Sequence, residues 1–317
     1  MEKIYDKKIS PILIIVILII AIIALFISIC FVACGEEDAT SGPPPEEVPA
    51  AEPEPEPESE GEEDPDIITV KEKIVYENEG LVITLKGFLA GEEGRIASWP
   101  KFQFLVENGT SENLKIRTIE SSVNGVMVNS YMMCETGPGG WSDAEMGLFT
   151  TDLNRANIEK IKDVEFVFHF IGEQSAIDYR YSDVISIRTS VDNSYVQAYD
   201  DSGTVLVDRG GIKIVNQGLF FESDISDVDL NLYIENNSGD DVRVRAKSCN
   251  INGIFIETFS EAVVLGGKKA YTAITFEKTA LLSEGIEDVE LLEIVFEISE
   301  SRSYSLIFDS EEITIEI

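Results

Sequence analysis

The side chains that most often perform acid–base or nucleophilic chemistry are scarce in this sequence. Its 317 residues include a single histidine, His169, and four cysteines, Cys30, Cys34, Cys134 and Cys249. His169 alternates with apolar residues in a strand-like stretch, so we expect a solvated strand residue rather than a catalytic base. No nucleophile elbow, phosphate-binding loop or zinc motif occurs, and the many carboxylates form no pair that stands out. The sequence therefore predicts no catalytic residue, no cofactor and no metal ion.

Two acidic segments have the oxygen-rich composition that a calcium ion requires. One contains Glu222, Asp224, Asp227 and Asp229, and the other contains Asp200 and Asp201. The first segment lacks the spacing and the glycine of an EF-hand loop, and the second has the composition of a turn. We therefore expect loops or turns at both places rather than metal sites.

The two tryptophans are the residues best suited to binding a ligand. Trp99 comes just after a loop expected near 90–98, and Trp141 follows the Gly-Pro-Gly-Gly segment at 137–140. Aromatic side chains on loops are common in binding surfaces. The alternative is that both residues serve in packing, for which tryptophan is equally suited. We predict Trp99 and Trp141 as ligand-binding candidates.

An internal repeat organises the chain after residue 66. Residues 107–187 align without a gap on residues 235–315, at an offset of 128 positions, and apolar positions correspond nearly throughout. Both tryptophans fall where the first repeat departs from the second. We predict two domains of one fold, at residues 67–190 and 191–317, joined by a short, strand-like linker at about 190–203.

Within each repeat the pattern is typical of short β-strands. Apolar residues occupy every second position over 164–170 and 228–234, which indicates half-buried strands. Asn-Gly pairs at 124–125 and 252–253 lie between such stretches and predict two-residue hairpin turns. The sequence therefore predicts an all-β fold of two tandem sandwiches.

One short helix is expected in each repeat, at about 152–156 and 279–284. Asn157 and Gly285 follow these segments at equivalent positions, and both residue types tolerate the left-handed conformation that ends many helices. We expect these two residues to act as matching caps.

These motifs together resemble a known class of repeat. The sequence has a G-I-K-I strand at 211–214, the strand ends "ENGT" at 107–110 and "ENNS" at 235–238, and an L-x-x-x-G-I-E segment at 281–287. This combination resembles the uncharacterised immunoglobulin-like repeats of Gram-positive, clostridial-type extracytoplasmic proteins, many of which are lipoproteins. The resemblance implies two immunoglobulin-like sandwiches and brings no catalytic residues. Asn108 and Asn236 also fit the N-glycosylation pattern, but we expect them to be turn residues that close a strand.

An apolar run at residues 12–33 predicts attachment to a membrane. As a helix it would be about 33 Å long, enough to cross a bilayer, and the lysines before it place the amino terminus in the cytoplasm. Its end, "FVACG" at 31–35, resembles the lipobox of bacterial lipoproteins, which implies cleavage before Cys34 and a lipid on that cysteine. A signal anchor and a lipidated Cys34 both stay open, and both give the same topology.

Residues 35–66 predict a disordered, extended linker. They contain eight of the eleven prolines and fourteen carboxylates, with no lysine or arginine. The whole chain has a formal net charge of −35 and no basic patch, so nucleic-acid binding is not expected.

The sequence thus predicts a non-enzymatic binding or scaffolding protein at the cell membrane, with most of the chain extracytoplasmic. Residues 1–34 are the signal anchor or lipoprotein signal peptide, and the linker and the two domains follow. The expected partners are the membrane, through the amino-terminal segment, and an unknown envelope protein or cell-wall ligand. The alternative is an extracytoplasmic sensor or an accessory subunit of an envelope enzyme or transport complex.

Overall fold

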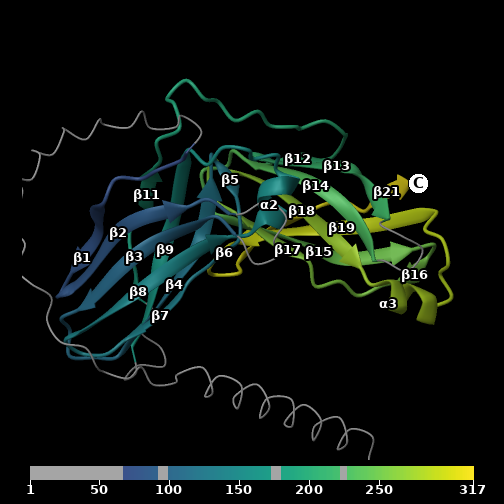
Figure 1. The fold of residues 1–317 in the computed structure, drawn as a ribbon. Coiled ribbons are helices and arrows are strands. Elements are labelled where there is room, and N and C mark those ends of the chain that lie inside the picture. The colour runs from purple at the N-terminus through teal and green to yellow at the C-terminus, as the bar shows by residue number, and fades with distance from the viewer. Residues whose placement is uncertain (1–66, 92–98, 173–179, 222–226) are drawn as a thin grey trace, which may run out of the picture. The chain divides into compact units, whose positions relative to one another are not determined.

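The computed structural model describes residues 67–317 except for 92–98, 173–179 and 222–226 (Figure 1). The predictions for residues 1–66, including the membrane segment, Cys34 and the acidic linker, lie outside the described residues. So do most of the loop near 90–98, and Glu222 and Asp224 of the first acidic segment. Neither helix in the described part of the chain is long and apolar enough to span a membrane.

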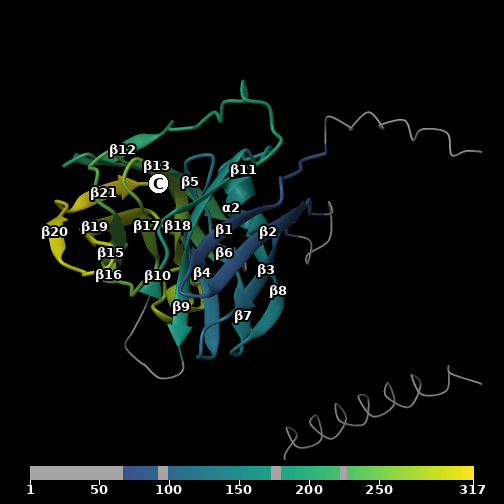
Figure 2. The ribbon, with the colours of Figure 1, turned by 90° about the vertical axis from the view of Figure 1, so that its left-hand side faces the viewer.

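Strands dominate the fold, as predicted. The first sheet contains, in spatial order, β1 (Lys73–Asn78), β2 (Leu81–Leu89), β3 (Lys101–Asn108), β8 (Gly140–Leu148) and β6 (Ser130–Tyr131). Figure 2 shows the layer of β1, β2, β3 and β8 beside a second layer that contains β4 and β9. Both are open sheets, which is consistent with an all-β, sandwich-like fold.

The second sheet is the largest. Its order is β10 (Arg180–Tyr181), β9 (Asp163–Gly172), β4 (Leu114–Val123), β5 (Val126–Met127), β18 (Lys269–Phe276), β14 (Val228–Asn236), β13 (Ile212–Phe221) and β12 (Thr204–Arg209), with β11 (Ile185–Arg188) on β9 and β7 (Met133–Thr136) on β4. The sheet passes from the first repeat to the second at a single parallel pairing, between Val126 of β5 and Lys269 of β18.

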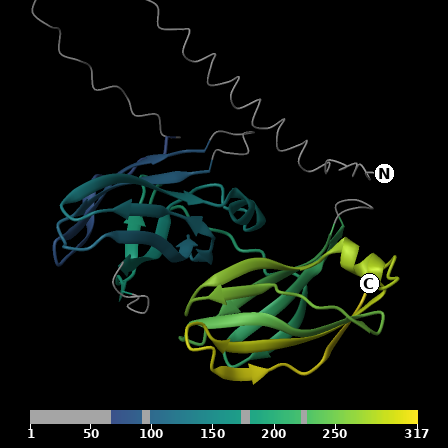
Figure 3. The same ribbon diagram turned by 90° about the horizontal axis from the view of Figure 1, so that it is seen from below.

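The third sheet belongs to the second repeat. Its order is β16 (Ile254–Phe255), β15 (Val242–Ile251), β19 (Leu291–Glu300) and β20 (Leu306–Asp309), with β17 (Glu261–Val264) on β15 and β21 (Ile313–Glu316) on β19. In Figure 3 the green-to-yellow strands of the second repeat form two facing layers. The remaining elements are the helices α2 (Thr150–Arg155) and α3 (Lys278–Ser283).

Two separate hydrophobic cores fill the spaces between these layers. The first includes Phe104 and Phe166, and the second includes Leu230 and Phe296, all of them almost completely buried. These residues come from the alternating stretches, because every second side chain of a strand points to the same face. All described residues nevertheless belong to one compact unit, so the domain boundary at 190/191 stays a prediction.

The turns and helix ends agree with the sequence patterns. Both residues of each Asn-Gly pair have positive φ, at 51° and 84° for Asn124 and Gly125 and at 52° and 81° for Asn252 and Gly253. This is the geometry of type I′ hairpin turns. Asn157 and Gly285 are also left-handed, with φ of 49° and 77°, so the predicted caps are confirmed. The helices begin and end within two residues of the predicted positions.

Asn108 and Asn236 make the same contacts in the two repeats. The Nδ2 group of Asn236 donates to the carbonyls of Asp240 and Val264, at 2.7 and 2.8 Å, while its Oδ1 accepts from the backbone N–H and hydroxyl of Ser238. Asn108 does the same with the residues 128 positions earlier. Both amides are buried. Each asparagine therefore closes its strand, as predicted, and its amide nitrogen is already used inside the protein.

The linker differs from its prediction. No strand lies between Arg188 and Thr204, so the strand-like interpretation of 190–203 is wrong. Its side chains and backbone bond to both repeats instead: the Tyr199 hydroxyl donates to the Asn124 carbonyl at 2.8 Å, and the Asp200 N–H donates to the Tyr271 hydroxyl at 2.8 Å. These bonds replace those of a strand ladder.

Candidate functional site

The two tryptophans do not form one site. Trp99 packs on Phe149, with ring centroids 4.6 Å apart, and it lies against Gly147 of β8. Trp141 is on the same strand as Gly147, but near the other end, opposite Glu107 of β3. The two positions on β8 are therefore about 20 Å apart.

Trp141 is the more exposed of the two, with 69% of its surface accessible. It lies on β8 rather than in a loop, because the turn between β7 and β8 ends at Gly139 and the pairing of β8 with β3 begins at Gly140. Trp99 is half-buried and packs against Phe149 and the outward face of β8 at Gly147. The ligand-binding prediction is untested for both, and only Trp141 presents most of its ring to solvent.

A groove of about 750 Å³ lies where the two repeats meet. This volume is within the range of small-molecule sites, roughly 300–1,000 Å³. The first repeat contributes the bulge of β4, the segment after β5, helix α2 and Tyr181 of β10. The second repeat contributes Arg243 of β15, parts of β17 and β18, and the turn after β19.

Several contacts, at the groove and next to it, join the two repeats. Arg302 binds Glu120 through two hydrogen bonds, of 3.1 Å from Nε and 2.7 Å from Nη2. Lys268 pairs with Glu165, and the Lys269 N–H donates to the Gly125 carbonyl at 3.0 Å. Each of these contacts joins the first repeat to the second.

Two residues of the groove have strained backbone. Six non-glycine residues in the described part of the chain have positive φ: Glu79, Glu120, Asn124, Asn157, Asn252 and Tyr304. Asparagine tolerates this region, and Glu79 precedes Gly80 in the tight turn between β1 and β2. That leaves Glu120, with φ of 54°, and Tyr304, with φ of 59°, and both line the groove. Such strain costs on the order of 1–3 kcal/mol per residue and clusters at functional sites.

Arginine–tyrosine contacts supply most of the groove's chemistry. The Arg243 guanidinium lies over the Tyr304 ring at 4.4 Å, and that of Arg302 lies over Tyr181 at 5.0 Å. Arg243 also pairs with Glu261 and donates to the Ser301 carbonyl at 3.0 Å. The Arg243 side chain is only 11% exposed, and its buried Nε has no hydrogen-bond partner in the described structure.

His169 lies beside this groove, and its prediction as a solvated residue is wrong. Only 6% of its surface is exposed, because Tyr181 stacks on its ring at 4.9 Å and Arg117 lies 3.5 Å from its Nδ1. Burial, followed by the positive charge of Arg117, lowers the pKa of His169. The equivalent pair in the second repeat is Arg245 with Glu297, which form two hydrogen bonds of 2.7 and 3.0 Å.

The other sequence candidates have structural roles. Asp227 accepts a hydrogen bond from the Lys278 N–H at the start of α3, and Asp229 accepts one from the Thr275 hydroxyl. Asp200 accepts from the Ser202 N–H, as in an Asx turn, and Asp201 pairs with Lys213. Among the described residues, no three His, Cys, Asp or Glu side chains are placed to share a metal ion.

The cysteines of the two repeats are packing residues, as expected. Cys134 and Cys249 are free thiols and both are buried. Burial raises the pKa of each, to about 12 for Cys249, so neither is a reactive thiolate at neutral pH.

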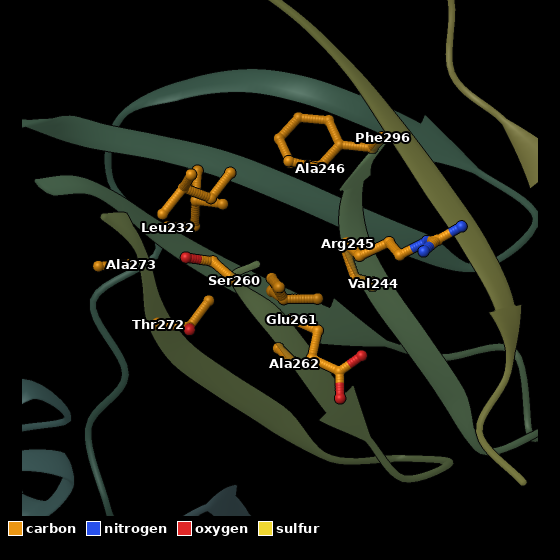
Figure 4. Close-up of a pocket in the computed structure, with 12 residues that line it drawn as sticks. Leu232, Val244, Arg245, Ala246, Ser260, Glu261, Ala262, Thr272, Ala273 and Phe296 are labelled. Carbon is orange, nitrogen blue, oxygen red and sulfur yellow. The ribbon is translucent and has the colours of Figure 1, made fainter. Parts of the chain in front are cut away.

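A second, much smaller gap lies between the sheets of the second repeat (Figure 4). Its volume is about 10 Å³, and Leu232 and Phe296 are among its apolar lining residues. A cavity of this size holds about one water molecule. Figure 4 shows the Arg245 side chain pointing away from the gap, so we attribute the gap to packing.

Comparisons with known proteins identify no family. No family model and no curated protein matches the chain. Solved structures with some likeness include the Escherichia coli chaperone DraB, at 8% identity and a TM-score of 0.19, covering 70% of this chain and 90% of that one. The CupB2 chaperone of Pseudomonas aeruginosa, at 9% identity and a TM-score of 0.19, covers 68% and 91%. A Porphyromonas gingivalis W83 protein of unknown function, at 10% identity and a TM-score of 0.20, covers 70% and 92%.

The groove residues could not be found from sequence spacing. Glu120 and Arg302 are 182 positions apart, and no motif connects them. The repeat alignment gives one hint of these positions. Glu120 aligns with Ser248 and His169 aligns with Glu297, so the first repeat differs from the second at Glu120 and at His169.

Proposed function

We propose that this protein is a membrane-tethered, extracytoplasmic binding protein that presents two tandem immunoglobulin-like sandwiches. The groove between the repeats is its ligand-binding surface in this proposal. The proposal rests on one observation. Two arginine–tyrosine contacts and two strained residues, contributed by both repeats, lie together in one groove of about 750 Å³.

The contacts of the groove carboxylates support binding rather than catalysis. Glu120 is held by Arg302 and Glu261 by Arg243, while Asp152 accepts two hydrogen bonds of 2.8 Å from Asn129. Each of these carboxylates already accepts hydrogen bonds within the protein, which suits recognition better than proton transfer. No histidine, cysteine or lysine is among the residues that line the groove in the described structure.

Repeated contacts support the two-domain part of the proposal. In addition to the asparagine caps, Ser182 and Ser310, at offset 128, each accept a hydrogen bond of 2.9 Å, from the N–H of Phe168 and of Phe296. Each repeat also has its own buried core. Trp141 is a second candidate for a partner contact, because its ring is solvent-exposed.

The membrane attachment can be tested directly. Intact-mass analysis of the membrane-extracted protein distinguishes the two anchors: a chain that starts at Cys34 and carries acyl groups is a lipoprotein, and a full-length chain has a helical anchor. Protease treatment of intact cells should release fragments of 67–317, and protection of those residues until the cells are lysed would contradict the extracytoplasmic location.

Binding can be tested with isolated cell walls. We expect the detergent-purified full-length protein to co-sediment with purified Gram-positive cell walls, and Tyr304→Gly to reduce the bound fraction. Tyr131→Ala is the matched control, because Tyr131 is exposed on β6 outside the groove. Trp141→Ala tests the second candidate surface. Failure of the wild-type protein to co-sediment would rule out the cell wall as its ligand.

A further inference from the structure

The charges in the groove differ from those of the rest of the protein. The whole chain has a net charge of −35, but the groove is lined by three arginines, Arg155, Arg243 and Arg302, and three carboxylates, Glu120, Asp152 and Glu261. Arg155 is exposed and forms no ion pair within the described structure. The groove is therefore locally neutral and can accept one negative charge far more readily than the surrounding surface.

A carboxylate suits this site better than a phosphate. The planar donor pair of an arginine matches both a carboxylate and a phosphate, but Arg302 already holds a carboxylate, that of Glu120, in this way. A ligand carboxylate that replaces Glu120 leaves the number of ion pairs unchanged. A dianionic phosphate would bring a second negative charge close to the three carboxylates of the lining.

The strained conformation of Glu120 favours such an exchange. This side chain is only 12% exposed and is held on Arg302 from a left-handed backbone. In the proposed exchange, release from Arg302 would free Glu120, which lies in the β4 bulge, to leave this conformation, and that would return part of the strain energy. The resident glutamate is thus a weaker competitor for Arg302 than an unstrained carboxylate would be.

The remaining lining resembles a surface for hydroxylated rings. Hydroxyl and amide groups surround the arginines, at Thr118, Ser121, Asn129, Ser130 and Thr272. The half-buried Ser130 hydroxyl lies 2.9 Å from that of Thr118 and 2.6 Å from that of Ser121, both of them buried, so it can both donate and accept. Tyr304 is 66% exposed; Arg243 covers one face of its ring, and the other face offers a flat apolar surface.

We infer that the groove binds a carboxylated saccharide, with the ligand carboxylate on Arg302 in place of Glu120 and a sugar ring against Tyr304. This inference rests on the proposed binding role of the groove and adds the chemical class of the ligand. Both Arg302 and Glu120 belong to the contact between the repeats, so the ligand also takes over part of that contact.

The test uses calorimetric titration of the detergent-purified full-length protein with trigalacturonic acid. Its methyl ester is the uncharged control ligand. We expect the acid to bind at least about tenfold more tightly than the ester, and Arg302→Gln or Tyr304→Gly to weaken binding of the acid at least about tenfold. Arg245→Lys and Tyr131→Ala, which lie outside the groove, should change the affinity less than about twofold.

Glu120→Gln gives the most specific readout. It removes the charge that competes for Arg302, so we expect tighter binding of trigalacturonic acid, by about three- to tenfold. A gain in affinity cannot result from a misfolded variant. Equal or weaker binding by Glu120→Gln would contradict the exchange at Arg302.

Three further results would overturn the inference: no binding of trigalacturonic acid, equal affinity for the acid and the ester, or equally tight binding of a tri-glutamate peptide. Binding of trigalacturonic acid without co-sedimentation with cell walls counts against the proposed wall partner alone. Groove-dependent wall binding without affinity for trigalacturonic acid counts against the carboxylated saccharide alone.

Discussion

At residue scale, some equivalent positions of the two repeats make the same contacts, and other equivalent positions make different ones. The asparagines at 108 and 236 make identical hydrogen bonds, whereas Glu120 is left-handed and its equivalent, Ser248, is not among the described residues with positive φ. Both strands have a bulge near this place, but it lies between Ile119 and Ser122 in β4 and between Ala246 and Ser248 in β15. Glu120 is therefore inside its bulge and reaches across to Arg302, whereas Ser248 pairs with Val295 of β19.

His169 should make stability depend on pH. Its pKa is lowered in the folded protein, so the unfolded chain takes up a proton first as the pH falls through about 6.5. We expect the free energy of unfolding in urea to decrease from pH 7.5 to 5.5 more in the wild type than in His169→Gln. Because His169 is the only histidine, no other histidine can account for the difference. Parallel pH profiles for the two proteins would contradict the lowered pKa.

Asn236→Ala should lower the free energy of unfolding by about 2–4 kcal/mol, because it leaves the buried carbonyl of Val264 without its donor and opens the turn at Ser238. The neighbouring Asn237→Ala is the matched control, since Asn237 is exposed, and should change stability by less than about 0.5 kcal/mol. Urea unfolding followed by circular dichroism measures both. Similar losses in the two variants would show that the asparagine cap contributes little.

At the scale of single elements, the two faces of β8 have different surroundings. Met146 and Leu148 enter the first core, while Trp141 and Glu145 point outward, and Glu145 pairs with Lys101 at 2.7 Å. At Gly147 the outward face is covered by Trp99, and an added Cβ would lie 2.8 Å from Trp99 Cε3. A glycine at this position is therefore required for Trp99 to pack.

Gly147→Ala should displace Trp99 and lower the free energy of unfolding by about 1–3 kcal/mol. The measurement is tryptophan fluorescence in a Trp141→Phe background, where Trp99 is the sole tryptophan, and we expect a red shift as Trp99 becomes exposed. Gly139→Ala tests a glycine of the turn before β8, one with open space around it but a φ of 68°. It should lower stability without a shift in the Trp99 emission, and a shift in both variants would contradict a specific contact at Gly147.

At the scale of the whole folded part, the two repeats are joined by few but varied contacts. One strand pairing, two ion pairs and the linker bonds to Tyr271 connect them, and Val215, Tyr233 and Tyr271 of the second repeat pack with the first core. The groove lies among these contacts, so its shape depends on how the repeats are held together.

A double-mutant cycle on Glu120→Gln and Arg302→Gln should give a coupling free energy of about 1 kcal/mol. The value is modest because Arg302 is more than half exposed, and it should decrease at high salt. The Arg245–Glu297 pair has the same bidentate geometry within one repeat and provides the comparison. Urea unfolding measures both cycles, and zero coupling between Glu120 and Arg302 would show that this contact does not stabilise the joint.

The sequence by itself determined the local features of this protein. Alternating residues specify strands, Asn-Gly pairs specify hairpins, and Asn157 and Gly285 specify helix ends, because each depends on the backbone preferences of a few neighbouring residues. The repeat also indicated that the same fold occurs twice. These features are short-range, so they can be read without knowing where the chain goes next.

Only the tertiary structure decided which residues meet. It placed the tryptophans at opposite ends of β8, buried His169 beneath Tyr181, and brought Glu120 together with Arg302. Such contacts join residues far apart in the chain, and their energies depend on burial and distance, which residue types alone do not specify. The groove arises only when both repeats are folded and joined, and for that reason no single stretch of the sequence encodes it.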